Sequence, residues 1–164
     1  MRKQKITPFL WFDGQAEQAM HYYVSIFKNS KAGKVTYYIE DSSYGKKGQV
    51  MSVRFELDGQ EFYGLNGGPM YKFSPAISFF VHCDTQAEID DLWEKLSAGG
   101  EENMCGWLQD KYGVSWQIIP EKLDELLQDK DPKKAKRIVD AMLQMKKIDI
   151  AALEKAYANG EMVS

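Results

Sequence analysis

The sequence contains few of the residues that bind transition metals or form covalent cross-links. It has only two cysteines, Cys83 and Cys105, too few for a disulfide framework and not spaced as zinc ligands. It also has only two histidines, His21 and His82, which leaves few imidazole groups for a metal centre. We therefore expect a cytoplasmic protein with reduced thiols.

Other absences exclude whole classes of protein. No apolar run approaches the roughly 20 residues of a membrane span, and the basic start Met1-Arg2-Lys3-Gln4-Lys5 leads into no apolar signal-peptide core. The formal net charge of −3 lacks the basic excess of nucleic-acid-binding proteins. With 44% hydrophobic and 13% aromatic residues, the 164-residue chain has the composition and length of one globular domain, expected to span 1–164.

The first part of the chain shows strand and helix patterns in a definite order. A short aromatic run ends at Asp13-Gly14, and apolar residues then recur at helical spacing in a segment that Gly33 stops. Asp58-Gly59 is a typical two-residue hairpin turn. The predicted elements are a strand at Ile6–Phe12, a helix from Ala16 to Phe27, and strands at Lys34–Ile39, Val50–Leu57 and Glu61–Asn66.

The same order then begins again. Thr85 and Glu88 have the spacing of a capping box at the start of a second helix, which Gly99-Gly100 ends. Asp110-Lys111-Tyr112-Gly113 predicts a turn between the last two strands. The predicted strands of this half are Ala76–Cys83, Met104–Leu108 and Ser115–Pro120.

The two halves form an internal repeat. Asp13-Gly14-Gln15-Ala16-Glu17 and Asp84-Thr85-Gln86-Ala87-Glu88 agree at four of five positions, 71 residues apart, and the same offset aligns Phe9 with Phe80. A chance match between two short amphipathic segments remains the alternative. We predict an α+β fold of two tandem β-α-β-β-β modules, at about 6–68 and 75–120, followed by a helical extension at about 121–160.

The helical extension carries capping signals of its own. Asp131-Pro132 places an N-cap residue before a proline at the first helical position, and Asp149 can cap the last helix. The lysines of the extension are mixed with acidic residues, which favours a solvated helix face over a binding patch. Its apolar stripe must be buried against the modules or against another subunit.

Three segments resemble the PhnB-like family, a branch of the vicinal oxygen chelate superfamily that includes glyoxalase, bleomycin-resistance and dioxygenase proteins. They are Pro8–Phe12, Leu65–Pro69 and Cys105–Gln117. The family is often labelled a 3-demethylubiquinone-9 3-methyltransferase domain. The resemblance implies that both modules curl into an open-barrel groove with helices outside, that the groove binds a small molecule, and that the protein is a homodimer.

The resemblance also implies the positions at which metal-dependent members of the superfamily hold a divalent ion. These positions are Thr7 and Asn66 in the first module, and Ser78 and Gln117 in the second. All four side chains are neutral and weak ligands, in place of the usual His and Glu. We therefore expect neither a metal ion nor another cofactor.

Strand alternation extends this set to a predicted ligand-binding groove. The expected lining residues are Thr7, Phe9, Trp11, Arg54, Asn66, Ser78, Phe80, His82, Trp107 and Gln117. Trp116 has the opposite parity to Gln117 and is expected under the helices. Rings and amides of this kind suit a planar or apolar ligand, so we expect a metal-free small-molecule-binding protein.

No residue is assigned a catalytic role, and several candidates keep a second interpretation. His82 is a general base or a surface histidine, and Cys105 is a nucleophile or an ordinary thiol. Arg54 anchors an anion or pairs with a neighbouring carboxylate, and Trp107 contacts the ligand or the core. The alternative function is an enzyme acting on a quinone-like or other small molecule. Methyl transfer is disfavoured because the chain lacks a glycine-rich nucleotide-binding turn.

Overall fold

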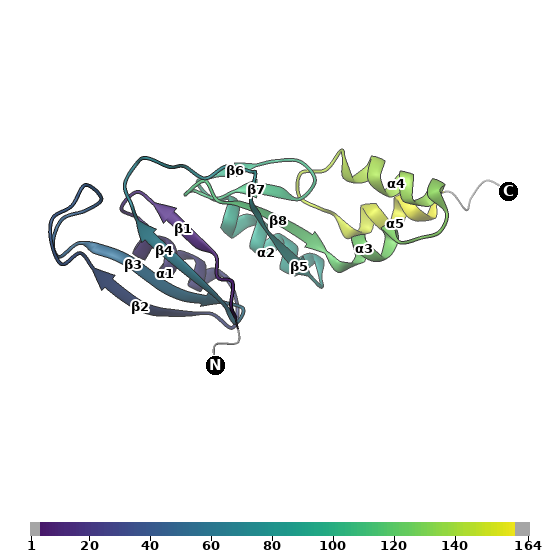
Figure 1. The fold of residues 1–164 in the computed structure, drawn as a ribbon. Helices are drawn as coiled ribbons and strands as arrows, with labels where there is room; N and C mark the ends of the chain where they lie inside the picture. The colour runs from purple at the N-terminus through teal and green to yellow at the C-terminus, as the bar shows by residue number, and fades with distance from the viewer. Residues whose placement is uncertain (1–3, 160–164) are drawn as a thin grey trace. The chain divides into compact units, whose positions relative to one another are not determined.

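The computed structural model describes residues 4–159. The predicted end of the extension, Gly160, and the first three residues of the basic start lie outside the described residues. The chain divides between Phe73 and Ser74 into two compact units, each of which is considered by itself (Figure 1). The first unit holds the first module, and the second unit holds the second module together with the helical extension.

The first unit is a four-stranded sheet with one helix packed on one face. Strand order is β1-β4-β3-β2, with β1 parallel to β4 and the other pairs antiparallel. Apolar side chains at alternate positions, such as Val53 and Phe55, face α1, where the Phe55 ring stacks on the buried Tyr23 ring. The elements are β1 (Phe9–Phe12), α1 (Ala16–Ile26), β2 (Lys31–Tyr37), β3 (Val50–Leu57) and β4 (Gln60–Asn66).

The hairpin between β3 and β4 confirms the predicted turn. Asp58 and Gly59 both have positive φ, at 46° and 76°, as a type I′ turn requires. The predicted stop at Gly33 was wrong, because α1 ends at Ile26 and Gly33 lies inside β2. A Cβ on Gly33 would lie 2.4 Å from the Arg54 carbonyl oxygen, so glycine permits a close approach of two strands there.

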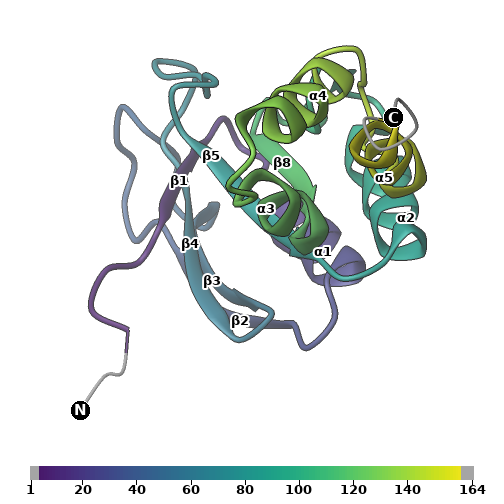
Figure 2. The same ribbon diagram turned by 90° about the vertical axis from the view of Figure 1, so that its right-hand side faces the viewer.

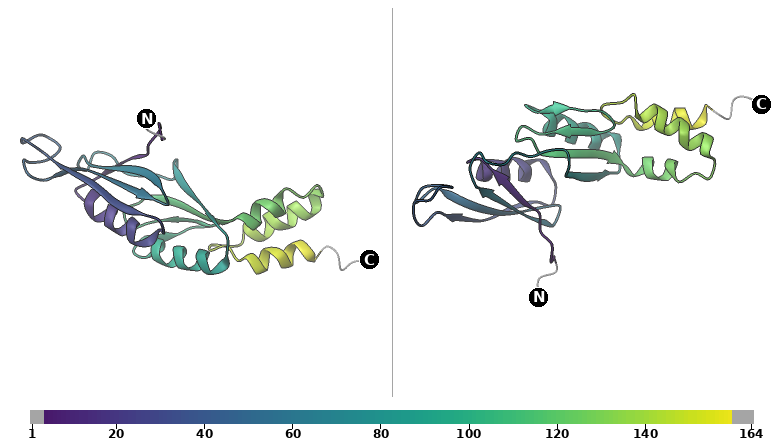
Figure 3. Two further views of the ribbon diagram at one scale, coloured as in Figure 1. Left: turned by 90° about the horizontal axis from the view of Figure 1, so that it is seen from below. Right: turned by 45° about the horizontal axis from the view of Figure 1, so that its top comes forward.

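The second unit repeats this topology, with strand order β5-β8-β7-β6 and β5 parallel to β8. In both units the helix lies on one face of the sheet (Figure 3). The predicted strand at Met104–Leu108 begins later, at Trp107, because Cys105 and Gly106 bend the backbone at φ 60° and 80°. The elements are β5 (Ser78–Cys83), α2 (Gln86–Ser97), β6 (Glu101–Glu102), β7 (Trp107–Gln109) and β8 (Ser115–Pro120).

The two helices begin differently, although they follow matching sequence motifs. In the second unit the predicted capping box is present: the Thr85 hydroxyl accepts from the Glu88 amide at 3.2 Å, and the Glu88 carboxylate accepts from the Asp84 amide at 2.9 Å. Gly14 replaces the threonine in the first unit. There the side chain of Asn66, at the end of β4, accepts from the Ala16 amide at 2.8 Å.

The helical extension consists of α3 (Glu121–Leu127), α4 (Pro132–Met142) and α5 (Ile150–Ala158), which pack together at the end of β8 (Figure 2). The predicted caps are confirmed, since Asp131 accepts from the Lys133 amide and Asp149 from the Ala152 amide. Six residues form its buried core: Ile119, Leu123, Leu126, Ile138, Ile148 and Leu153. Within residues 4–159, no helix has both the length and the apolar character needed to cross a membrane.

Candidate ligand-binding faces

The sheet of each unit has one face covered by its helix and a second face that we call the open face. On the first open face, Phe9 and Trp11 of β1 stand on the side opposite the buried Leu10 and Phe12. Phe9 is 59% exposed although it is a large apolar ring. The predicted placement of these two rings on one face is therefore confirmed.

Three further aromatic rings join them, and the sequence interpretation missed all three. Tyr63 of β4 pairs with Phe9 in the ladder, and their rings stack at 5.8 Å between centroids. Tyr44 and Tyr71 meet the Trp11 ring edge-on, at 6.3 Å and 5.0 Å. The indole N–H of Trp11 donates to the Gly68 carbonyl at 2.9 Å and so fixes the orientation of the ring.

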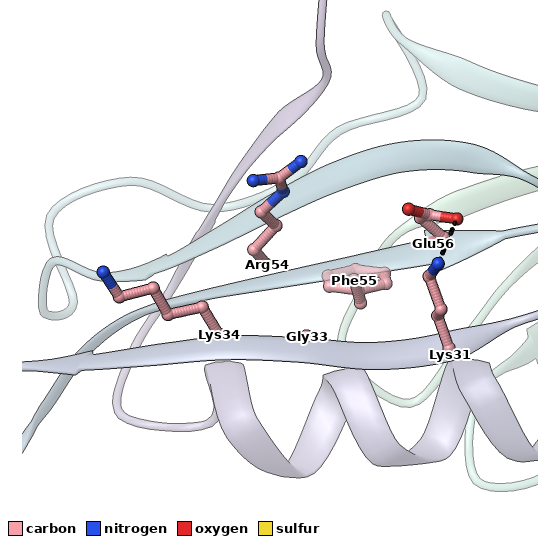
Figure 4. Close-up of a pocket in the computed structure, with 6 residues that line it drawn as sticks. All are labelled: Lys31, Gly33, Lys34, Arg54, Phe55 and Glu56. Atoms are coloured by element: carbon pink, nitrogen blue, oxygen red, sulfur yellow. Dashed lines mark ion pairs between the residues drawn. The ribbon is translucent and has the colours of Figure 1, made fainter.

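The other half of the first open face is charged. Arg54 of β3 pairs with Glu61 of β4, and Lys31 of β2 lies 3.5 Å from Glu56. Arg54 therefore pairs with a carboxylate on the neighbouring strand, which is one of the two roles expected for it. A pocket of about 280 Å³ opens between β2 and β3 (Figure 4). Its lining residues are Lys31, Gly33, Lys34, Arg54, Phe55 and Glu56.

The second open face gathers the predicted residues of the second module. Gln117 of β8 pairs with Phe80 on one side and with Trp107 on the other. The Gln117 amide donates to the Ser78 hydroxyl at 2.9 Å, so these two predicted positions are in direct contact. Phe80 is 43% exposed and lies beside the His82 ring. Trp116, of opposite parity, is buried on the α2 side, as predicted.

His82 has an acidic partner that the sequence interpretation missed. Its Nδ1 lies 2.7 Å from a carboxylate oxygen of Glu121, the first residue of α3, and both side chains are at least half exposed. The signal was available in principle, because parallel pairing of β5 with β8 sets Cys83 opposite Pro120. The other histidine, His21, is exposed on α1 near Glu17, as expected.

Of two further predicted lining residues, Asn66 points away from the open face and Thr7 lies outside the strand expected to hold it. Asn66 is buried, and its amide is used twice by the fold, in the bond to Ala16 and in a donation to the Val50 carbonyl at 3.0 Å. It points to the helix side because residues 62, 64 and 66 of β4 alternate toward α1. Thr7 precedes β1 rather than lying within it.

The ladders correct the equivalence between the modules. Phe9 pairs with Tyr63, and its repeat partner Phe80 pairs with Gln117. Tyr63 is therefore the first-module counterpart of Gln117, in place of Asn66. A tyrosine ring, a threonine, a serine and an amide do not match the donors that a divalent ion prefers. Within residues 4–159, no three His, Cys, Asp or Glu side chains form a group that could hold a metal ion.

The two thiols lie in different environments. Cys83 is fully buried at the end of β5, and burial, followed by the Glu88 and Asp84 carboxylates, raises the pKa of its thiol to about 12. Cys105 is half-buried, and its backbone amide donates to the Met145 carbonyl at 2.7 Å. No hydrogen bond joins a cysteine side chain to a histidine in the described part of the chain, because the histidines pair with glutamates and the Cys83 thiol donates to the Val81 carbonyl.

The arrangement of strands and the exposed rings can be compared with known proteins. The family model described as 3-demethylubiquinone-9 3-methyltransferase matches residues 4–119. The chain belongs to this PhnB-like family. A PhnB protein structure from Bacillus cereus, whose description carries the same methyltransferase label, is 41% identical and has a TM-score of 0.65. The match covers 71% of this chain and 99% of that chain.

More distant structures share the fold alone. Protein PA1353 from Pseudomonas aeruginosa is 20% identical with a TM-score of 0.56, over 73% of this chain and 98% of that chain. The fosfomycin resistance protein FosX from Listeria monocytogenes, in complex with Mn(II) and sulfate, is 15% identical with a TM-score of 0.51. That match covers 78% of this chain and 98% of the FosX chain. Among curated proteins, none matches the chain.

Proposed function

We propose that the protein binds a planar or apolar small molecule on the open faces of its sheets, without a metal ion. The observation that carries the proposal is the exposure of large rings, above all Phe9 and Phe80, on faces whose neighbouring groups are hydrogen-bonding side chains. Exposed rings beside a few polar groups are typical of small-molecule sites, in which apolar contacts supply affinity and polar groups supply orientation.

The polar groups of the second open face are neutral and already oriented. Gln117 and Ser78 hold each other through one hydrogen bond, which leaves the Gln117 carbonyl oxygen to accept from a ligand. These groups favour a hydrogen-bonding ligand over a divalent cation, since none of them compensates a double positive charge.

The experiment is a binding titration followed by tryptophan fluorescence, with 1,4-naphthoquinone as the probe. Trp11 and Trp107 lie on the open faces, whereas Trp93 and Trp116 are buried between α2 and its sheet. We expect saturable quenching that falls by about half in Trp11→Phe or Trp107→Phe. Ile39→Ala, at an 85% exposed loop position, is the control and leaves the titration unchanged.

Native mass spectrometry of the freshly purified protein provides an independent check. We expect a retained organic molecule or an empty chain, each without metal. One tightly held Ni, Zn, Mn or Fe ion per chain after loading contradicts the metal-free proposal, and quenching that does not saturate contradicts the binding proposal.

A second candidate function is an enzyme acting on a quinone-like or other small molecule. The contact between His82 Nδ1 and Glu121 favours it, because a carboxylate at one ring nitrogen orients an imidazole for proton transfer at the other. Turnover of a substrate that is lost in His82→Gln and reduced in Glu121→Gln supports this candidate. A ligand that binds tightly and is recovered unchanged supports binding alone.

We further propose that the protein is a cytoplasmic homodimer. Both cysteines are free thiols, which suits a reducing compartment, and exposed apolar side chains outside the strands, such as Met70 and Ile77, offer apolar surface for a second copy. A monomer at micromolar concentration by light scattering contradicts the dimer, and secretion of the native chain contradicts the location.

A further inference from the structure

The edge strand of the first open face contains a bulge that changes which side chains reach that face. Ala32 pairs with Phe55 and Val35 with Val53, so β2 uses one more residue than β3 across this interval. The extra residue lies at Gly33-Lys34, opposite Arg54. Because a bulge reverses the alternation of side chains, it brings both Lys31 and Lys34 onto the open face.

The result is a face with more cationic than acidic groups. Three cations, Lys31, Lys34 and Arg54, face two carboxylates, Glu56 and Glu61. Lys31 and Arg54 each have a carboxylate partner, whereas Lys34 forms no ion pair with any residue of the described range 4–159. Figure 4 shows Lys34 and Arg54 extending from adjacent strands beside the pocket. A guanidinium has five N–H donors, so its bond to Glu61 leaves others available.

These cations belong to one row that crosses the sheet. The ladder sets Arg54 opposite Tyr63, and Tyr63 opposite Phe9. From the edge inward, the row therefore contains an ammonium, a guanidinium and two stacked rings. Adjacent strands are about 4.8 Å apart, so Arg54 and Phe9 are separated by two strand spacings, or about 10 Å. The row therefore presents cationic groups and flat aromatic rings to a ligand at the same position along the strands.

We propose that the ligand of the first open face is an aromatic carboxylate. Its carboxylate lies between Lys34 and Arg54, and its ring system lies over Tyr63 and Phe9. This inference rests on the proposed binding function and names the chemical class of the ligand. A planar carboxylate accepts two hydrogen bonds from a guanidinium, and a flat ring stacks on tyrosine or phenylalanine.

The test is isothermal titration calorimetry of the full chain with two matched probes, 2-naphthoate and the neutral 2-naphthalenemethanol. We expect 2-naphthoate to bind at least tenfold more tightly, and to weaken between 50 and 500 mM salt while the neutral probe does not. In Lys34→Gln the affinity for 2-naphthoate falls about fivefold, and the affinity for the neutral probe is unchanged. Lys130→Gln, an exposed lysine of the second unit, is the charge-matched control and changes neither affinity.

The outcomes separate the two proposals. Equal affinity for both probes, or an equal effect of Lys34→Gln and Lys130→Gln, overturns the aromatic carboxylate and leaves the binding function standing. Binding of neither probe overturns both. Arg54→Lys is the second variant, because it keeps a cation beside the buried Glu61 while it removes the planar donor pair; we expect a threefold to tenfold loss for 2-naphthoate only. An unchanged affinity in Arg54→Lys also contradicts the proposal.

Discussion

The two sheets have the same strand order, but their open faces differ in what covers them. In the first unit, β2 and β3 are long, with seven and eight residues, and the face they extend holds five charged side chains. In the second unit, the equivalent strands β6 and β7 have only two and three residues. One end of the second open face is covered by the helical extension, because Ile119 belongs to the core of α3, α4 and α5.

One duplicated scaffold therefore has an exposed, charged sheet face in the first unit and a sheet face partly covered by helices in the second. The extension is tied to the second module at two places: the Gly106 amide donates to the Lys146 carbonyl, and Gln86 of α2 bonds to Ile148 and Ile150. Gly106 has a φ of 80°, and a Cβ there would lie 2.6 Å from the Ile119 side chain. The family match ends at residue 119, so the extension lies beyond the matched module.

The largest expected effect is the loss of stability caused by a substitution in the core of the helical extension. Leu153 of α5 is fully buried, so Leu153→Ala removes its packing and leaves a cavity that costs about 3 kcal/mol. The measurement is urea unfolding followed by fluorescence in a Trp11→Phe background, in which every remaining tryptophan belongs to the second unit.

Leu143→Ala serves as the control for that variant. Leu143 is 51% exposed at the end of α4, and its truncation is expected to cost less than about 0.5 kcal/mol. Equal destabilisation by the two variants means that the extension is not packed as a core, and the contrast between the open faces then fails.

The sequence predicted the order of elements apart from β6 and α3, because its signals are local. The Asp58-Gly59 turn and the Thr85–Glu88 capping box act within a few residues, and both are present. The turn also determines register: it sets Leu57 opposite Gln60, and counting outward pairs Arg54 with Tyr63. The sequence therefore contained enough information to place Tyr63 on the same sheet face as Arg54. The same count places Asn66 on the opposite face of the sheet.

Other features depend on contacts that no local pattern reports. The bulge in β2 is visible only when the ladder is counted on both strands, because Gly33 reads equally well as the end of a helix. The docking of the extension depends on backbone bonds from Cys105 and Gly106 to Met145 and Lys146, about 40 residues away. Periodicity predicted that the extension has an apolar stripe, but it left open which surface covers that stripe.

The next largest effect concerns the two helix starts. Asn66→Ala removes one acceptor at the start of α1 and one donor to the Val50 carbonyl, both at a buried position. We expect a loss of about 2 kcal/mol in the unfolding free energy of the first unit. Thr85→Ala removes one exposed cap in the second unit, with an expected loss of about 1 kcal/mol. Thermal and urea unfolding, followed by circular dichroism, measure the loss of unfolding free energy in each variant. A larger loss in Thr85→Ala contradicts the conclusion that Asn66 stabilises its helix start more than Thr85 does.

The smallest expected effect is the pH dependence of the extension. The hydrogen bond from Lys147, followed by that from Gln86, lowers the pKa of Asp90, and the hydrogen bond from the Tyr157 hydroxyl lowers the pKa of Asp129. A carboxylate with a lowered folded-state pKa stabilises the folded protein above its unfolded pKa of about 3.8, and this contribution is lost as the pH falls through the folded value. We therefore expect the melting temperature to fall between pH 5 and pH 3, and to fall less in the variant with both Asp90→Asn and Asp129→Asn. Asp91→Asn, which removes an exposed pair within α2, is the control and keeps the wild-type slope. An acid slope that is the same in all three proteins shows that neither the Asp90–Lys147 contact between α2 and the extension nor the Asp129–Tyr157 contact within the extension contributes to the pH dependence.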